Sequence, residues 1–489
     1  MQALKPLDAA WLLVDNKETP MHVGSLTIFS LPADAPPNFL HKLFDHLRNA
    51  RSFASPYNLK LKTPWLKGLN MTWQEDFNID LEYHLRYSAL PSPGGERELG
   101  VLVSRLHSHP MDFSRPLWEC HIIEGLENNR FALYMKMHHS LVDGVGGMRM
   151  LQRMLSDDPK ARAMPPPWSV GAGGQRPRGA RSGSGLPLWQ QWLDKAKAQA
   201  ETLPGVGRAL AHVVTERVRQ SSAAEALPFS GPQSILNRRV SGQRRFATQY
   251  YELERIKRVA KAADVTVNDV FLGLCAGALR RYLEEIQALP EKPLTAGVPV
   301  SVRPAGDEAV GNAISFIIAN LNTHIADPLI RLQAIRRSTQ IAKEHLQQLP
   351  KAGIDNYTML FMAPFILQLL TGLGGKGRPM FNVTISNVPG PDRPLYFNGA
   401  RMEQMYPVSL LSHGQALNIT VVSYAGQFNI GFTGCRNTLP RMQRLAVYMG
   451  EALEELERLT KTAAPKARKA KAASPRRRAP ARRKPVAGA

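Results

Sequence analysis

The residues with the clearest chemical potential are two adjacent histidines, His138 and His139, followed by Ser140-Leu141-Val142 and then Asp143-Gly144. A neutral imidazole, with an ordinary pKa of about 6.5, can take a proton from a hydroxyl group when its tautomer is fixed. Adjacent side chains at the end of a strand point to opposite sides, so the two rings cannot easily share a metal ion. No further Cys or His stands nearby at ligand spacing. The pattern favours general-base chemistry, with acyl transfer as the leading reaction, over a metal site.

The elements around the histidines can be predicted from periodicity. Residues 131–137 alternate between apolar and other side chains, which predicts a strand that ends at the histidines. Apolar residues from Met148 to Leu155 recur at helical spacing, which predicts a helix that begins near Gly144. Asp143 stands directly before it and could complete a triad with a histidine. We favour the other role, in which Asp143 caps the helix and binds an arginine.

The segment 138–144 resembles the HHxxxDG motif of the CoA-dependent acyltransferase superfamily. Flanking segments narrow this resemblance to the bacterial wax ester synthase/diacylglycerol acyltransferases. These segments are Lys5–Asp8, Pro20–Gly24, Arg115–Glu119, Val267–Val270, Ser386–Pro391 and Leu417–Thr420. They stand in the family's order, and the resemblance covers residues from about 4 to about 458.

The resemblance implies a direct acyl transfer with His139 as the general base. His139 would deprotonate a fatty alcohol or the free hydroxyl of diacylglycerol, and the oxygen would attack the thioester of acyl-CoA. Neither an acyl-enzyme nor a metal or other cofactor is expected, and acyl-CoA is a substrate. The implied fold is α/β, with two chloramphenicol-acetyltransferase-like domains of mixed sheets flanked by helices, which form a pseudo-dimer with a central tunnel.

Residues close to the motif have supporting roles in this interpretation. His138 would pack or form hydrogen bonds that shape the turn, and Gly144 would let the backbone approach closely, because a side chain there would crowd the base. The segment Pro116-Leu117-Trp118 resembles a family motif and either contacts the acyl chain or forms an apolar entry to a strand.

Five positions in the second half of the chain are further candidates. Asn268 and Asp269 stand at the head of an apolar helix predicted over 270–279, where capping is the alternative to a functional role. Arg303 ends a strand-like run and is the candidate partner of Asp143. Thr384 and Ser386 share one face of a strand predicted over 381–387 and could donate a hydrogen bond to an oxyanion. The alternative is an edge strand with a solvated face.

The length of 489 residues suits two domains with connections. We predict an N-terminal acyltransferase domain over residues 1–160 and a C-terminal acyltransferase-like domain over 230–460. Between them, residues 161–229 are a Pro/Gly-rich crossover and a linking helix over 188–197, which packs across both domains or lies on lipid. The apolar stretch 359–370 is too short for a membrane span and lines the core, a substrate channel or a lipid contact.

The charge of the chain is concentrated at its C-terminal end. Eleven Lys or Arg and no Asp or Glu follow from Lys461 onward, within a formal net charge of +22. We therefore predict a disordered basic tail over 461–489 that could contact anionic lipid, DNA or another polyanion without specificity. Three scattered cysteines and the absence of a leader pattern predict a cytoplasmic protein, peripherally associated with the inner membrane or with lipid inclusions.

Other functions remain as alternatives at this stage. An acyltransferase for small acceptors would need a narrower and more polar pocket than the apolar stretches suggest. A condensation domain would use carrier-protein thioesters, and no carrier segment accompanies the chain. A non-catalytic coat protein of lipid inclusions, or a nucleoid tether, would explain the basic tail but would leave His139 without a purpose.

Overall fold

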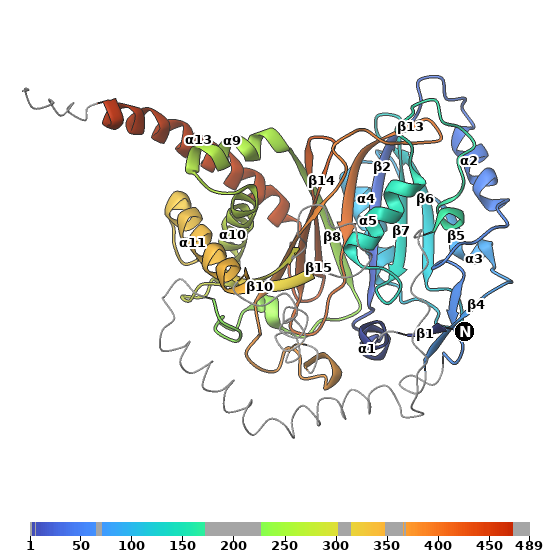
Figure 1. Cartoon of the computed structure of the whole chain (residues 1–489), viewed down its shortest axis with the longest axis horizontal. Coiled ribbons are helices and arrows are strands. Elements are labelled where there is room, and N and C mark those ends of the chain that lie inside the picture. Colours follow the sequence, from blue (N-terminus) through green and yellow to red (C-terminus); the bar gives the residue numbers. More distant parts are fainter. Residues whose placement is uncertain are drawn as a thin grey trace, which may run out of the picture.

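The computed structural model describes residues 2–4, 6–64, 71–171, 226–301, 314–347, 365 and 368–472. Strands within these residues form two six-stranded sheets and a small three-stranded sheet. The two large sheets stand next to each other at the centre of the molecule, and helices flank them (Figure 1). The predicted α/β class with mixed sheets is therefore confirmed.

The first large sheet carries the histidine motif. Its strand order is β12 (Tyr396–Phe397), β13 (Ala400–Val408), β2 (His22–Ser30), β7 (Arg130–His138), β6 (Trp118–Leu126) and β5 (Leu85–Ala89). β7 is the strand predicted over 131–137, and it pairs antiparallel with both β2 and β6. β7 is paired on both edges, and side chains on both of its faces are buried, including that of Lys136.

The first sheet is not built from the N-terminal half alone. β12 and β13 come from the C-terminal half, and β13 pairs antiparallel with β2. The predicted domains, 1–160 and 230–460, therefore do not separate the two sheets. The physical reason is that β2 would otherwise expose an edge of unpaired backbone groups, which β13 satisfies. The three-stranded sheet comprises β1 (Gln2–Ala3), β4 (Thr72–Glu75) and β3 (Leu59–Leu61).

The second large sheet belongs to the C-terminal half. Its strand order is β10 (Ile314–Asn320), β9 (Thr295–Ser301), β11 (Val383–Pro389), β14 (Leu417–Tyr424), β15 (Gln427–Cys435) and β8 (Arg244–Glu252). Its helical layer contains α9 (Leu253–Ala263), α10 (Val267–Glu285), α11 (Pro328–Gln347) and α13 (Arg444–Ala472). The helix predicted over 270–279 lies within α10, and apolar residues of these helices and strands form one continuous core.

The helices of the first half are α1 (Pro6–Val14), α2 (Phe39–Arg48), α3 (Leu81–His84), α4 (Glu96–Ser108), α5 (Gly144–Met154) and α6 (Pro167–Val170). A 3-10 turn spans Ile235–Asn237. α4 joins the halves, because Ser104 Oγ accepts from Phe246 N–H (2.8 Å) and Ser108 Oγ accepts from Arg244 N–H (2.8 Å). These bonds bind β8 of the second sheet to a helix of the first half.

Two predictions concern the ends and connections of the chain. α13 continues to Ala472, so the prediction of disorder from residue 461 is wrong for its first part; the alanines and lysines there are strong helix formers. The rest of the tail, residues 473–489, lies outside the described residues, as do the predicted helix over 188–197 and most of 359–370.

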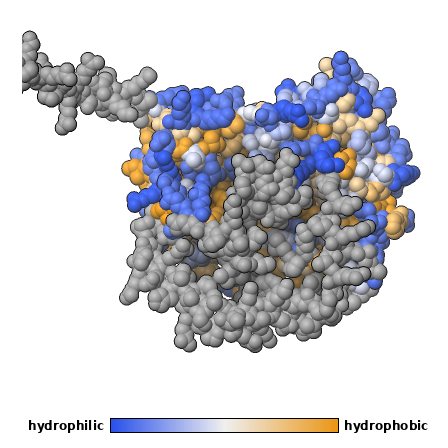
Figure 2. Space-filling view, in the orientation of Figure 1, coloured by the Kyte–Doolittle hydropathy of each residue, from blue (hydrophilic) through white to orange (hydrophobic). Residues whose placement is uncertain are grey.

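The surface of the second half carries exposed apolar side chains. Figure 2 shows hydrophobic residues over its helices, below a hydrophilic upper edge. Ile330 of α11 and Val447 of α13 are among the exposed ones. In the described part of the chain, no single helix has the length and apolar character to cross a membrane; α9 and α10 meet that test only as a pair, bent by 98°.

Candidate active site

The backbone of the histidine pair is held from both sides. β7 ends at His138, whose N–H donates to the carbonyl of Leu117 (3.0 Å), while the N–H of His139 donates to the carbonyl of Met21 (2.8 Å). Leu117 directly precedes β6 and Met21 directly precedes β2, the two strands that flank β7. The turn that presents both imidazoles is therefore fixed by its neighbours.

The ring of His139 is half-buried and lies against Trp11 of α1, with ring centroids 4.5 Å apart. Burial lowers the pKa of His139 to about 4, although a hydrogen bond to its own backbone and the charge of Asp143 act in the opposite direction. At neutral pH the ring is therefore neutral and can act as a base.

The ring of His138 has different surroundings. It is fully buried and meets Phe113 edge-on, with centroids 5.6 Å apart. Its Nδ1 accepts from the N–H of Ser140 (3.2 Å) and lies 2.7 Å from Ser140 Oγ. A neutral imidazole whose Nδ1 is an acceptor carries its proton on Nε2. His138 is thus held as the Nε2–H tautomer by its own turn.

Asp15 is a neighbour of the motif that the sequence analysis missed. It lies in the connection between α1 and β2, and its buried carboxylate accepts from Met21 N–H (2.6 Å). The same oxygen, Oδ2, is 3.5 Å from His138 Nε2. The sequence offers little sign of this contact, because Asp15 lies far from His138 in the chain and falls between two of the segments that resemble the family.

Asp143 caps the helix that follows the motif, as we favoured. Its Oδ1 accepts from Gly146 N–H (2.6 Å), and α5 begins at Gly144. The close approach expected at Gly144 is wrong, because Gly144 is exposed and an added Cβ would meet only Val388, at an ordinary 3.7 Å. The tight position is Gly146, where a Cβ would lie 3.1 Å from Asp143 Oδ1, since this residue sits directly under the cap.

The segment Pro116-Leu117-Trp118 is buried at the start of β6. Trp118 Nε1 donates to the carbonyl of Tyr57 (2.8 Å), and its ring stacks on His84 and on Trp168. Together with the bond from His138 to Leu117, these contacts favour the apolar strand entry, which braces the motif from the neighbouring strand.

Asn268 and Asp269 take part in a helix start of the second half. Thr266 is the N-cap of α10, and Asp269 completes a capping box in which its Oδ2 accepts from Thr266 N–H (3.0 Å). The other oxygen of Asp269 accepts from Thr339 of α11 (2.7 Å). These contacts are those of the capping alternative for Asp269, and Asn268 is half-buried beside it.

β11 brings the second sheet towards the motif. Thr384 and Ser386 lie on β11 with half-buried side chains, and Thr384 Oγ1 is 3.5 Å from Gln415 Oε1. Farther along the strand, Val388 is the residue that an added Cβ at Gly144 would meet. β11 thus runs past the start of α5. The hydroxyls of Thr384 and Ser386 therefore remain candidates for the hydrogen bond to an oxyanion. Arg303 lies outside the described residues.

A pocket of about 190 Å³ opens between the α1–β2 connection and the second half. It is lined by Val14, Asn16, Glu18, Thr19, Met21, Arg239, Gln368, Leu369, Gly372 and His413. Met21 both lines this pocket and accepts the N–H of His139, so the pocket adjoins the backbone of the proposed base.

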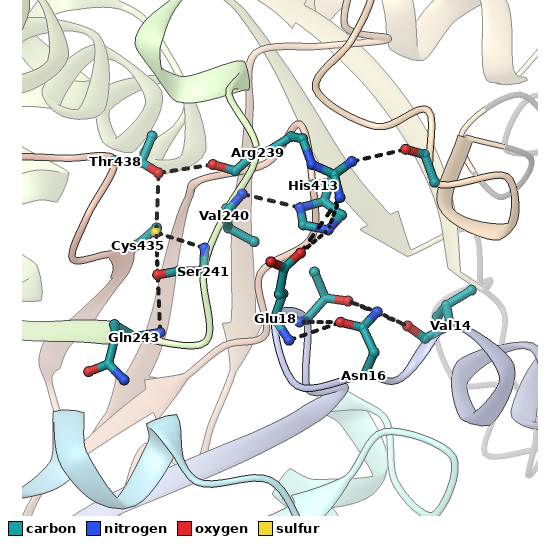
Figure 3. A network of polar contacts seen from close by, with 12 residues as sticks. Val14, Asn16, Glu18, Arg239, Val240, Ser241, Gln243, His413, Cys435 and Thr438 are labelled. Carbon is teal, nitrogen blue, oxygen red and sulfur yellow. Dashed lines mark hydrogen bonds and ion pairs between the residues drawn. The ribbon is translucent and has the colours of Figure 1, made fainter.

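Charged side chains from both halves meet at this pocket (Figure 3). His413 Nε2 is 3.1 Å from Glu18 Oε2, and Arg239 is 3.6 Å from the same oxygen. Val240 N–H donates to His413 Nδ1 (3.2 Å), and Arg239 Nη2 lies 2.9 Å from His413 Nε2. Burial, and then the charge of Arg239, lower the pKa of His413. Two side chains of the second half, His413 and Arg239, therefore lie against one carboxylate of the first.

Metal ligands and nucleophilic thiols are the other catalytic groups to consider in the described residues. No group of three or more His, Cys, Asp or Glu side chains in those ranges is placed to hold a metal ion. Cys120, Cys275 and Cys435 are free and buried, and burial raises the pKa of both Cys120 and Cys275. Thiols with a raised pKa are poor nucleophiles.

The chain matches two protein-family models. Residues 4–271 match the wax ester synthase/diacylglycerol acyltransferase catalytic domain, and residues 310–457 match the WS/DGAT C-terminal domain. Both matches contain candidate residues named above: the first includes the histidine motif, and the second includes β11 with Thr384 and Ser386.

Individual proteins are similar over nearly the whole chain. A putative diacylglycerol O-acyltransferase of Mycobacterium tuberculosis is 45% identical over 480 residues, which cover 93% of this chain and 96% of that protein. The O-acyltransferase WSD of Acinetobacter baylyi is 42% identical, over 94% of this chain and 97% of the relative. The solved structure of a wax ester synthase/diacylglycerol acyltransferase from Marinobacter aquaeolei is 40% identical and superposes with a TM-score of 0.73, over 94% of this chain and 100% of its own.

Proposed function

Because this chain belongs to the wax ester synthase/diacylglycerol acyltransferase family, we propose that it transfers a long acyl group from acyl-CoA to a fatty alcohol or to diacylglycerol. The family and the O-acyltransferase class predicted from the sequence motifs are confirmed by these similarities. The products would be a wax ester and a triacylglycerol. The observation that carries the proposed chemistry is a neutral, half-buried His139 fixed at the end of β7.

The proposed reaction is a direct displacement. The acceptor nitrogen of His139 takes the hydroxyl proton, and the hydroxyl oxygen forms a bond to the carbonyl carbon of the thioester. The tetrahedral intermediate then collapses, the carbon–sulfur bond breaks, and the CoA thiolate receives the proton from His139. The ester leaves, and His139 is again neutral.

The intermediate carries a negative oxygen that needs a hydrogen-bond donor. We assign this role to a hydroxyl of β11, Thr384 or Ser386, because β11 runs past the start of α5. Asp143, by capping α5, would keep the motif turn in place, and the pairing of Asp143 with Arg303 stays a prediction.

The substrates are apolar, and we propose that the enzyme meets them at a lipid surface. Leu370 and Leu373 are 43% and 53% exposed and follow Leu369, which lines the pocket beside Met21. The basic segment from Lys461 onward would add attraction to anionic phospholipid, at about 1 kcal/mol per basic residue near the surface. Contact of this segment with DNA or with lipid inclusions is the competing possibility.

The lipid proposal is tested with a full-length variant in which the eleven basic residues from Lys461 onward are glutamine. We expect the native chain, and not the variant, to sediment with vesicles that contain anionic phospholipid at low salt. Equal sedimentation of both chains would reject the role of the basic segment. Binding to duplex DNA instead of vesicles would assign the segment to nucleic acid.

The acyl transfer is tested by the release of free CoA from palmitoyl-CoA, with hexadecanol or dioleoylglycerol as the acceptor. We expect release that depends on the acceptor, together with the corresponding ester. The ratio between the two acceptors ranks wax ester against triacylglycerol synthesis. Absence of release with either acceptor from a folded protein would reject the proposed substrates.

A further inference from the structure

Asp15 connects the two histidines of the motif through a chain of contacts. Its Oδ2 accepts from Met21 N–H (2.6 Å), and the carbonyl of the same Met21 accepts from His139 N–H (2.8 Å). The carboxylate therefore holds Met21, the residue to which the backbone of the proposed base is bonded. A displacement of Met21 would move the backbone of His139 directly.

The same carboxylate oxygen faces the other histidine. Ser140 N–H donates to His138 Nδ1, which places the ring proton of a neutral His138 on Nε2. That nitrogen is 3.5 Å from Asp15 Oδ2, an electrostatic contact somewhat longer than a formed hydrogen bond. Both side chains are buried, with 0% and 7% of their surface exposed, so little water screens the contact.

We propose that Asp15 is the positioning residue of this active site: its carboxylate faces and orients the Nε2–H of His138 and, through Met21, sets the position of His139. This inference rests on the proposed acyl transfer. Asp15 does not touch the reacting atoms, and it acts through Met21 and His138. In this arrangement His138 is an anchor of the turn, while His139 moves the proton.

The geometry gives the expected effect on catalysis. A base that shifts by about 1 Å from a hydroxyl loses about 10²-fold in rate, whereas substrate binding at a distance from the base is unaffected. Asp15→Ala should therefore lower kcat by about 10²-fold and leave KM for palmitoyl-CoA unchanged. Asp15→Asn keeps an acceptor for Met21 N–H but loses the charge that faces His138, so its kcat should fall between those of the native chain and the alanine variant.

The experiment measures kcat and KM for palmitoyl-CoA with hexadecanol in the full-length native chain, Asp15→Asn, Asp15→Ala, His138→Gln and Asp15→Asn/His138→Gln. If Asp15 acts through His138, the double variant should be no slower than the slower of its two single variants. Lys17→Ala, an exposed change in the same connection, is the matched control and should keep the native kcat.

A spectroscopic measurement separates positioning from a loss of folding. The ring nitrogens of ¹⁵N-histidine-labelled protein report the tautomer, and His138→Gln identifies the signal of His138. We expect the Nε2–H tautomer in both chains, because Ser140 N–H donates to Nδ1, and a changed His138 Nε2–H chemical shift in Asp15→Asn, which loses the charge that faces this nitrogen. An Asp15→Ala variant with native kcat, or an unchanged His138 Nε2–H chemical shift in Asp15→Asn, would overturn the inference. An inactive native chain would instead reject the proposed function.

Discussion

Two β-hairpins of this protein have the same topology, but the residues at their C-terminal ends differ in chemistry. β6 and β7 form an antiparallel pair in the first sheet, and β14 and β15 form one in the second. Each hairpin leads, after a short connection, into a helix, α5 in the first sheet and α13 in the second. β7 leads into His138 and His139, whereas β15 ends at Cys435.

The residues at the two ends are placed differently. His139 is half-buried against Trp11, and burial lowers its pKa, so the ring is neutral at neutral pH. Cys435 is fully buried, and its sulfur accepts from Ser241 N–H (3.4 Å) and Thr438 Oγ1 (3.2 Å). The first end presents a half-buried, neutral imidazole, whereas the sulfur of the second accepts hydrogen bonds from its own neighbours. A repeated architecture thus carries chemistry only where the last residues of the hairpin supply it.

The largest difference is expected when the residue at the end of each hairpin is replaced by alanine. His139→Ala should lower kcat for hexadecanol by about 10²-fold to 10⁴-fold, because the general base is lost. Cys435→Ala should retain native kcat, because its sulfur makes only local contacts. Release of free CoA is the measurement, with circular dichroism to show that both variants fold. Comparable losses in the two variants would mean that His139 has no special role.

The pH dependence of catalysis sharpens the same comparison. Burial lowers the pKa of His139 to about 4, and only the neutral ring can accept the hydroxyl proton. We therefore expect kcat/KM to be constant between about pH 5 and pH 8 and to decline as the pH falls through about 4. Initial rates from pH 3.5 upward, with circular dichroism at each pH, are the measurement. A midpoint near 6.5, the ordinary histidine value, would show that the base is not desolvated.

The interiors of the two hairpins also differ, which predicts different costs of mutation. Glu119 and Lys136 face each other across β6 and β7 as a buried ion pair (3.0 Å), whereas β14 and β15 pair the neutral Asn418 and Thr433. Lys136→Met would leave the buried Glu119 carboxylate without its cationic partner, beside His121 Nε2 (3.2 Å), and should lower the free energy of unfolding by about 3–5 kcal/mol. Thr433→Val removes only the acceptor of Ser409 N–H and should cost about 1–3 kcal/mol.

Urea denaturation followed by tryptophan fluorescence measures both costs. The double variant Glu119→Gln/Lys136→Met is the control, because it removes both charges and should recover part of the loss. A loss for Lys136→Met no larger than that for Thr433→Val would show that the ion pair adds little to the stability of the first hairpin.

The sequence was sufficient where the signals are local. Alternation predicted β7, helical spacing predicted α5 and the apolar part of α10, and the position of Asp143 before a helix predicted its cap. The motif residues predicted the family, since their order and spacing are preserved along the chain. These features depend on neighbouring residues, which a single sequence contains.

The features that the sequence could not supply depend on contacts between distant segments. β13 completes the first sheet although it belongs to the second half, because the edge of β2 needs a partner. Asp15 reaches His138 only through the packing of α1 and β2 against β7. The position that limits side-chain size is Gly146 rather than Gly144, which follows from the direction of the Asp143 carboxylate and not from the motif.

The two glycines therefore give the smallest and most local test. Gly144→Ala places a Cβ in ordinary contact with Val388, and alanine is the better helix former, so stability should stay the same or rise. Gly146→Ala places a Cβ 3.1 Å from Asp143 Oδ1, and the carboxylate must move from its bond to the 146 N–H. Relative to Gly144→Ala, this variant should lose about 1 kcal/mol of unfolding free energy, the usual worth of an N-cap. Differential scanning calorimetry compares the two, and equal melting temperatures would mean that the Asp143 cap does not stabilise the turn after the histidines.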